Sequence, residues 1–113
     1  MTLVSVERCS WCGAPLEAGD GWRAAERAGE RVAGFCRLEH VVPWSLKGAH
    51  WDAGTLREPA HLEDSLTHCA HCEEELPEHY VLLVRHRGEH RIPDAFCSVG
   101  HMTEWCKRGG RWQ

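Results

Sequence analysis

The 113-residue chain contains seven cysteines and nine histidines, an unusually large supply of metal-binding and redox-active side chains. Eight of these residues recur at matching spacings in two parts of the chain, as a Cys-x2-Cys pair followed by a Cys-x3-His pair. The first set comprises Cys9, Cys12, Cys36 and His40, and the second comprises Cys69, Cys72, Cys97 and His101. Three thiolates and one imidazole suit tetrahedral zinc. The sequence therefore predicts two Zn²⁺ ions per chain, one in each set.

A Cys-x2-Cys pair alone is compatible with a disulfide framework, a metal site or a redox pair. Seven thiols leave one over from any all-disulfide scheme, and the N-terminal sequence MTLVSVERCSW lacks the features of a secretory signal. A reducing, cytoplasmic location is therefore expected, where such spacings indicate metal binding. A thioredoxin-like redox role is disfavoured because no βαβ pattern surrounds the cysteines.

The two sets belong to a longer internal repeat with an offset of 58 to 61 residues. Each copy has an aromatic residue after the first cysteine pair, a Gly-Glu turn between two extended stretches, and a phenylalanine before the third cysteine. Two copies of one module are the economical explanation. The stretches WRAAERAGERVAGF and YVLLVRHRGEHRIPDAF each predict a β-hairpin. The Cys-x3-His pair is predicted to lie on a helix, where residues four apart share a face.

A cysteine knuckle, a hairpin and a ligand-bearing helix together describe a treble clef. The segments CSWCGAPLEAGDGW…GFCRLEH and CAHCEEELPEHY…AFCSVGH resemble the treble-clef zinc fingers of the ribosomal L24e, TRASH and MYM (FCS-type) group. The resemblance covers most of the chain and implies RNA binding, metal handling or protein interaction. Here the last ligand is His40 or His101 instead of cysteine, which preserves zinc binding but weakens the implication of soft-metal sensing.

The predicted fold is a small, metal-stabilised α+β protein built from two tandem treble-clef fingers. The first Cys3His finger covers residues 1–44 and the second covers residues 69–113. Residues 45–68 form a linker, in which Pro59 and the leucines that follow it suggest a short helix. Trp51, in the same linker, is expected to pack on one of the fingers.

Four aromatic residues are predicted to be core, because a small finger has few other side chains large enough to cover its metal. They are Phe35, Trp44, Phe96 and Trp105. Each tryptophan follows a predicted histidine ligand by four residues, so it shares that helix face and packs against the hairpin. Cys106 is predicted to be a free thiol turned away from the ligand face. His68 and His71, which flank Cys69, are expected to be solvated.

The charge of the chain disfavours a dominant role in nucleic-acid binding. Seventeen acidic residues outnumber thirteen basic ones, for a net charge of −4, and each Cys3His zinc site adds a formal −1. A surface that follows phosphates normally needs an excess of lysine and arginine. Arg85, Arg87, Arg91 and the segment KRGGR are the basic groupings, and they could contact RNA locally. No apolar run long enough for a membrane span is present.

These observations favour a small cytoplasmic zinc protein that acts as an interaction or adaptor module, with protein as its partner and without catalysis. Neither the identity of the partner nor the oligomeric state follows from the sequence. An RNA- or ribosome-associated zinc finger is an alternative, which the basic groupings keep open.

An HNH-type endonuclease is a second alternative, because LEHVVPWSLKGAHWDAG is similar to the Asp-His-Val/Ile-Pro segment of those enzymes. His40 would then be the general base, and the two Cys-x2-Cys pairs would together hold one structural zinc. That arrangement leaves the other predicted ligands without a role. The segment also shows no convincing counterpart of the central asparagine of the HNH motif, since Asp52 would have to take its place. A catalytic zinc is also disfavoured, because four protein ligands leave no position for an activated water.

Overall fold

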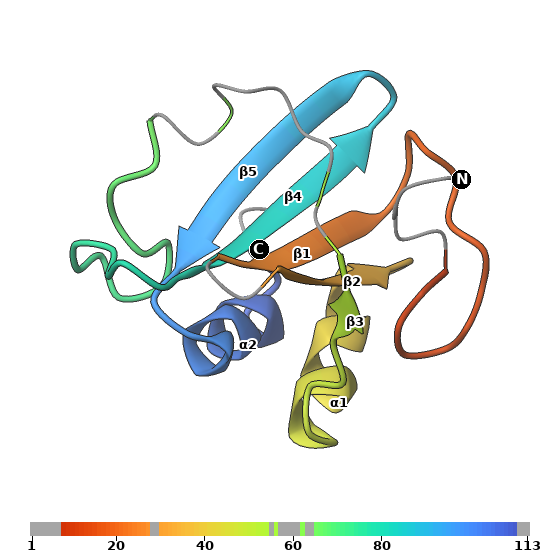
Figure 1. The fold of residues 1–113 in the computed structure, drawn as a ribbon, viewed down its shortest axis with the longest axis horizontal. Helices are drawn as coiled ribbons and strands as arrows, with labels where there is room; N and C mark the ends of the chain where they lie inside the picture. The colour runs from red at the N-terminus through yellow and green to blue at the C-terminus, as the bar shows by residue number, and fades with distance from the viewer. Residues whose placement is uncertain (1–7, 28–29, 55, 57–61, 63–64, 111–113) are drawn as a thin grey trace.

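The computed structural model describes residues 8–27, 30–54, 56, 62 and 65–110. The described strands form one antiparallel sheet of five strands, in the order β3-β2-β1-β4-β5 (Figure 1). Two hairpins supply four of them, β1 (Trp22–Glu26) with β2 (Arg31–Phe35), and β4 (Val81–Arg87) with β5 (His90–Phe96). The short strand β3 (Asp52–Ala53) adds to the edge of β2. Both predicted hairpins are confirmed.

Each hairpin is followed by helical structure. A 3₁₀ turn, η1 (Leu38–His40), leads into α1 (Val41–Leu46), and α2 (Val99–Lys107) follows β5. The prediction that cysteine and histidine share a helix is wrong in one respect, because Cys36 and Cys97 precede the helices. Ser98 explains this in the second copy: its backbone is extended, with φ −160° and ψ 166°, and its hydroxyl accepts a hydrogen bond from the His101 N–H as the N-cap of α2.

The two hairpins join through β1 and β4, whose pairing is symmetric about its centre. Trp22 pairs with Arg85 at one end and Glu26 pairs with Val81 at the other. Ala24 and Leu83, the third residue of each strand, therefore face one another in the middle. The two copies of the repeat are thus related by an approximate twofold axis within one continuous sheet. The pairing of β1 with β4 takes one strand from each copy.

One face of the sheet is covered by α1 and α2, which lie beside each other in Figure 1. Side chains from all four long strands meet Val41, Trp44, Met102 and Trp105 of the helices there, in one hydrophobic cluster. The four aromatic residues predicted to be core are all buried. In each copy, the tryptophan packs edge-on against the phenylalanine of its hairpin, with ring centroids 5.1 Å apart. On the opposite face, Ala25 and Val32 pack with Leu16 and Leu56.

The long edge strand β5 is protected from further strand pairing. The Ala95 carbonyl points away from β4 and accepts a hydrogen bond from the Ala70 N–H at 2.8 Å. Because backbone groups alternate in direction along a strand, Pro93 also directs its nitrogen outward, where it has no N–H to donate. A proline on an exposed edge discourages pairing with a second chain.

The linker packs partly as expected. Trp51 makes an edge-on contact with Trp44, with ring centroids 5.0 Å apart, so its predicted packing on a finger is confirmed. The short helix predicted after Pro59 falls largely outside the described residues. No described helix has the length and apolar character needed to cross a membrane.

Candidate metal centres

Each Cys-x2-Cys pair lies in a tight turn that points its sulfurs to one side. In the first turn the Gly13 N–H donates to the Cys9 carbonyl at 2.9 Å, and in the second the Glu73 N–H donates to the Cys69 carbonyl at the same distance. Both donor residues have positive φ, +78° for Gly13 and +65° for Glu73. The left-handed conformation closes the knuckle around its two cysteines.

In the first cluster, the turn that carries Cys9 and Cys12 lies beside the end of β2 and η1. The Nδ1 atom of His40 lies 3.5 Å from Cys9 Sγ and 3.4 Å from Cys36 Sγ. The Cys12 and Cys36 sulfurs are 3.6 Å apart. These contacts place one donor atom from each of the four predicted residues around a common point.

The second cluster repeats the arrangement at the end of β5 and the first turn of α2. The Nδ1 atom of His101 lies 3.7 Å from Cys69 Sγ and 3.1 Å from Cys97 Sγ. The sulfurs of Cys72 and Cys97 are 3.4 Å apart. In both clusters the histidine therefore presents Nδ1 to the sulfurs, so Nε2 is the nitrogen that carries the proton of a neutral metal-bound ring.

The distances in both clusters suit a single tetrahedral ion. In each, the four donor atoms all lie within 4.8 Å of one another. An ion with metal–sulfur bonds of about 2.3 Å holds two tetrahedral sulfur ligands about 3.8 Å apart. The sulfur–sulfur distances of 3.6 and 3.4 Å lie close to that value and far above a disulfide bond. The two Cys3His groups could therefore hold two metal ions.

Two of the thiols in each cluster have pKa values that are shifted in opposite directions. Burial opposes the ionisation of Cys9, but backbone hydrogen bonds and the contact with His40 outweigh it and lower its pKa to about 6. Burial and hydrogen bonds to the other two thiols raise the pKa of Cys36 to about 11. Burial likewise opposes the ionisation of Cys69, but backbone hydrogen bonds and the contact with His101 outweigh it and lower its pKa to about 6. Burial and the neighbouring thiols raise the pKa of Cys97 to about 12. A divalent cation would offset the repulsion among three thiolates.

The structure separates the two Cys-x2-Cys pairs into different clusters. The single four-cysteine zinc site of the endonuclease alternative is therefore not formed among the described residues. Cys106 lies outside both clusters, as predicted, and is buried as a free thiol. Burial and the Asp94 carboxylate raise the pKa of the Cys106 thiol to about 12.

Sequence reasoning missed a contact behind the second cluster. The His71 ring packs against the ring of His101, with centroids 5.1 Å apart, instead of being simply solvated. Arg108, at the end of α2, places Nη2 3.2 Å from His71 Nδ1. His71 occupies the position that Trp11 holds in the first knuckle, which is the one signal in the sequence that marks it. Nothing in the local pattern marks Arg108.

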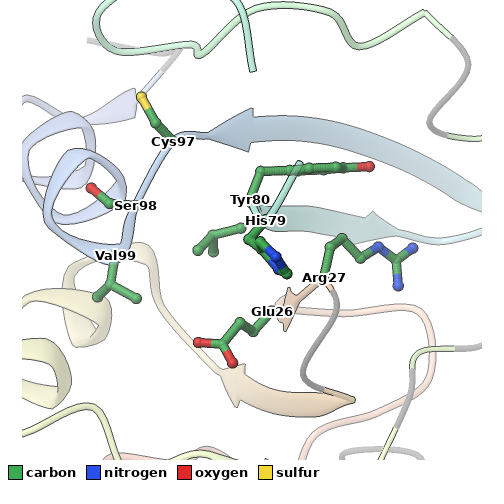
Figure 2. Close-up of a pocket in the computed structure, with 8 residues that line it drawn as sticks. Glu26, Arg27, His79, Tyr80, Cys97, Ser98 and Val99 are labelled. Carbon is green, nitrogen blue, oxygen red and sulfur yellow. The ribbon is translucent and has the colours of Figure 1, made fainter. Parts of the chain in front are cut away.

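An open cavity of about 460 Å³ lies between the β1–β4 junction and the start of α2 (Figure 2). Figure 2 shows the Cys97 side chain pointing away from the imidazole of His79 and the carboxylate of Glu26. The Glu26 carboxylate is engaged by the Arg31 guanidinium at 2.7 Å. Because Cys97 is one of its lining residues, the cavity adjoins the second cluster.

No protein-family model matches the chain, and neither a curated protein nor a solved structure is significantly similar to it.

Proposed function

We propose that this chain is a zinc-binding module that holds one structural Zn²⁺ in each Cys3His cluster and acts as a protein-interaction adaptor without catalysis. The observation that carries the proposal is the convergence of four donor atoms within 4.8 Å in both clusters. Three thiolates and an imidazole are ligands typical of structural zinc. The order of knuckle, hairpin and helix in each half supports a treble-clef relationship to the L24e, TRASH and MYM group.

A structural role for the metal follows from the number of ligands. Four protein donors complete a tetrahedral sphere, so neither cluster keeps a position for a metal-activated water. His40 Nδ1 lies beside two sulfurs, which suits a ligand and leaves that nitrogen unavailable as the base of an endonuclease. In this role the metal supplies folding free energy, on the order of 10 kcal/mol for each site.

An interaction role is supported by the surface of the molecule. Trp11 and Leu46 are large hydrophobic residues with exposed fractions of 41% and 70%. In the proposed role, these two side chains would contact the partner protein. The net charge of −4 opposes the binding of polyphosphates.

RNA or ribosome association is a weaker proposal that rests on the β4–β5 hairpin. The guanidinium of Arg85 lies over the Trp22 ring at 5.2 Å, and Arg91 donates to the Gly88 and His90 carbonyls. These contacts hold the guanidinium groups of Arg85 and Arg91 against other parts of the protein, so part of the positive charge of the hairpin is used within the molecule. Salt-dependent RNA binding that is lost when Arg85 and Arg87 are neutralised would favour this role over the adaptor. Absence of saturable binding at physiological salt would favour the adaptor.

Metal content is the direct test of the proposal. Protein purified under reducing conditions is expected to contain two zinc ions per chain by elemental mass spectrometry. Cys36→Ser and Cys97→Ser should each retain about one, because each removes a ligand from one cluster only. A single zinc that neither substitution changes would contradict the two-site assignment and favour the endonuclease alternative.

A further inference from the structure

The two clusters differ in how far solvent reaches them. Cys12 is exposed, whereas its counterpart Cys72 is half-buried. The contact between Cys12 and Cys36 lies at the surface, and the corresponding contact in the second cluster is partly buried. A small oxidant therefore reaches the first pair of sulfurs more readily than the second.

Among the residues that the structure describes, the second cluster also has an outer contact that the first lacks. His71 packs on the ligand ring of His101 and is itself held by Arg108. At the equivalent position of the first knuckle, the Trp11 side chain is 41% exposed to solvent. Groups that hold a metal-binding histidine in place strengthen metal binding. The outer contact thus favours retention of metal at the second cluster.

The first knuckle has an attachment to the sheet that does not depend on metal. The Ser10 N–H donates to the Gly34 carbonyl at 2.7 Å, and the Gly34 N–H donates back to Ser10 Oγ at 3.0 Å. In the second copy Ala70 makes the first of these bonds, to Ala95, and has no hydroxyl for the other. The first knuckle can therefore stay docked on β2 when its metal leaves.

We propose that Cys12 and Cys36 form a peroxide-sensitive switch, in which oxidation joins them in a disulfide and releases the metal of the first cluster alone. The inference rests on the proposed function, since it requires a metal in both clusters. The sulfurs start 3.6 Å apart and must approach to about 2.05 Å for the bond to form.

The reaction balances with a peroxide as the two-electron oxidant. One thiolate attacks a peroxide oxygen, the O–O bond breaks, and a sulfenic acid forms while the departing hydroxide takes a proton and leaves as water. The second thiolate attacks that sulfur, the S–O bond breaks, and a second hydroxide takes a proton and leaves as water. Cys9 and His40 remain as two ligands, too few to hold the ion against dilution.

The test uses the full-length, zinc-loaded chain treated with hydrogen peroxide in the presence of a chromogenic zinc chelator. Release is expected to stop at one zinc per chain. Peptide mapping by mass spectrometry without reduction should then find a Cys12–Cys36 disulfide, and a dithiol with added zinc should restore the second equivalent. Concurrent loss of both zincs, loss without this disulfide, or resistance of both sites would each overturn the inference.

Two substitutions test the outer contact. His71→Ala and Arg108→Ala are expected to make the second zinc releasable by peroxide, whereas His90→Ala, on the exposed hairpin turn, should leave it in place. Zinc content and circular dichroism before oxidation establish that each variant is folded. A chain that purifies without metal refutes the proposed function and this inference together, whereas two zincs lost at equal rates refute this inference alone.

Discussion

The hydroxyl oxygens of Thr103 and Ser45 lie 2.7 Å apart and share a hydrogen bond that joins α2 to α1. Thr103 is 4% exposed, and its hydroxyl also lies 2.8 Å from the Val99 carbonyl. The contact links the helices that follow the two clusters, so it couples the two halves of the molecule on the helical face as β1 and β4 do within the sheet.

Thr103→Val removes this buried hydrogen bond at nearly constant volume. We expect the free energy of unfolding to fall by about 1 kcal/mol, and by up to about 3 kcal/mol if the Ser45 hydroxyl is left without a partner. Chemical denaturation of the zinc-loaded protein, followed by circular dichroism, measures the change. Glu104→Gln on the same helix is the control: it breaks an exposed ion pair with Lys107 and should have little effect. Equal stability of both variants would show that the helix contact contributes nothing.

Leu83 lies at the centre of the β1–β4 pairing and is 1% exposed. Leu83→Ala is expected to lower the free energy of unfolding by about 2–5 kcal/mol through lost burial and the cavity left behind. Because Leu83 packs in a core shared by both halves, a chelator should then remove zinc from both clusters faster than from the unsubstituted chain. Leu46→Ala, at a site 70% exposed, should change stability by less than about 0.5 kcal/mol. Faster loss from only one cluster would argue against a shared core.

Glu73 adopts φ +65° at the position where the first knuckle has Gly13 at φ +78°. A residue with a Cβ pays about 1–2 kcal/mol for this left-handed conformation. Glu73→Gly is therefore expected to raise the free energy of unfolding by about 1 kcal/mol. Thermal unfolding measures the gain. Glu74→Gly is the matched control, because Glu74 has no positive φ, and it should be neutral or destabilising. A destabilised Glu73→Gly variant would mean that the carboxylate has a role that outweighs the strain.

Cys106 is 5% exposed, and burial together with Asp94 raises its pKa from 9.0 to about 12. The neutral thiol is favoured in the folded state, so its contribution to stability is complete below pH 9 and is lost as the pH rises toward 12. The stability difference between the unsubstituted chain and Cys106→Ala should shrink across this range, as measured by denaturation at successive pH values. A difference independent of pH would show that the thiol ionises equally in both states.

Much of the candidate site could be predicted from the chain alone. The repeated spacings identified the eight donors, because a tight turn and a hairpin bring nearby residues together in any copy of the module. The aromatic residues of the core followed from their positions beside the ligands. Alternation and turn residues identified both hairpins, but the helix boundary was misplaced because the capping of α2 by Ser98 excludes Cys97.

The relationship between the two copies could not be predicted in this way. The repeat is equally compatible with two separate fingers and with one continuous sheet, since each hairpin reads the same in both cases. The pairing of β1 with β4, centred on Ala24 and Leu83, distinguishes them, and it depends on contacts between segments far apart in the chain. The difference between the two clusters could not be predicted for the same reason, because Arg108 contacts His71 only after α2 is packed in place.

The sequence by itself determined which side chains can bind metal, how they divide into two sets and which local elements carry them, because these depend on spacing within each copy. The tertiary structure decided that β1 and β4 merge the copies into one sheet, that His71 and Arg108 pack beside the second cluster, and that Cys12 of the first cluster is exposed. Those outcomes arise from burial and packing between segments far apart in the chain, which local spacing does not determine.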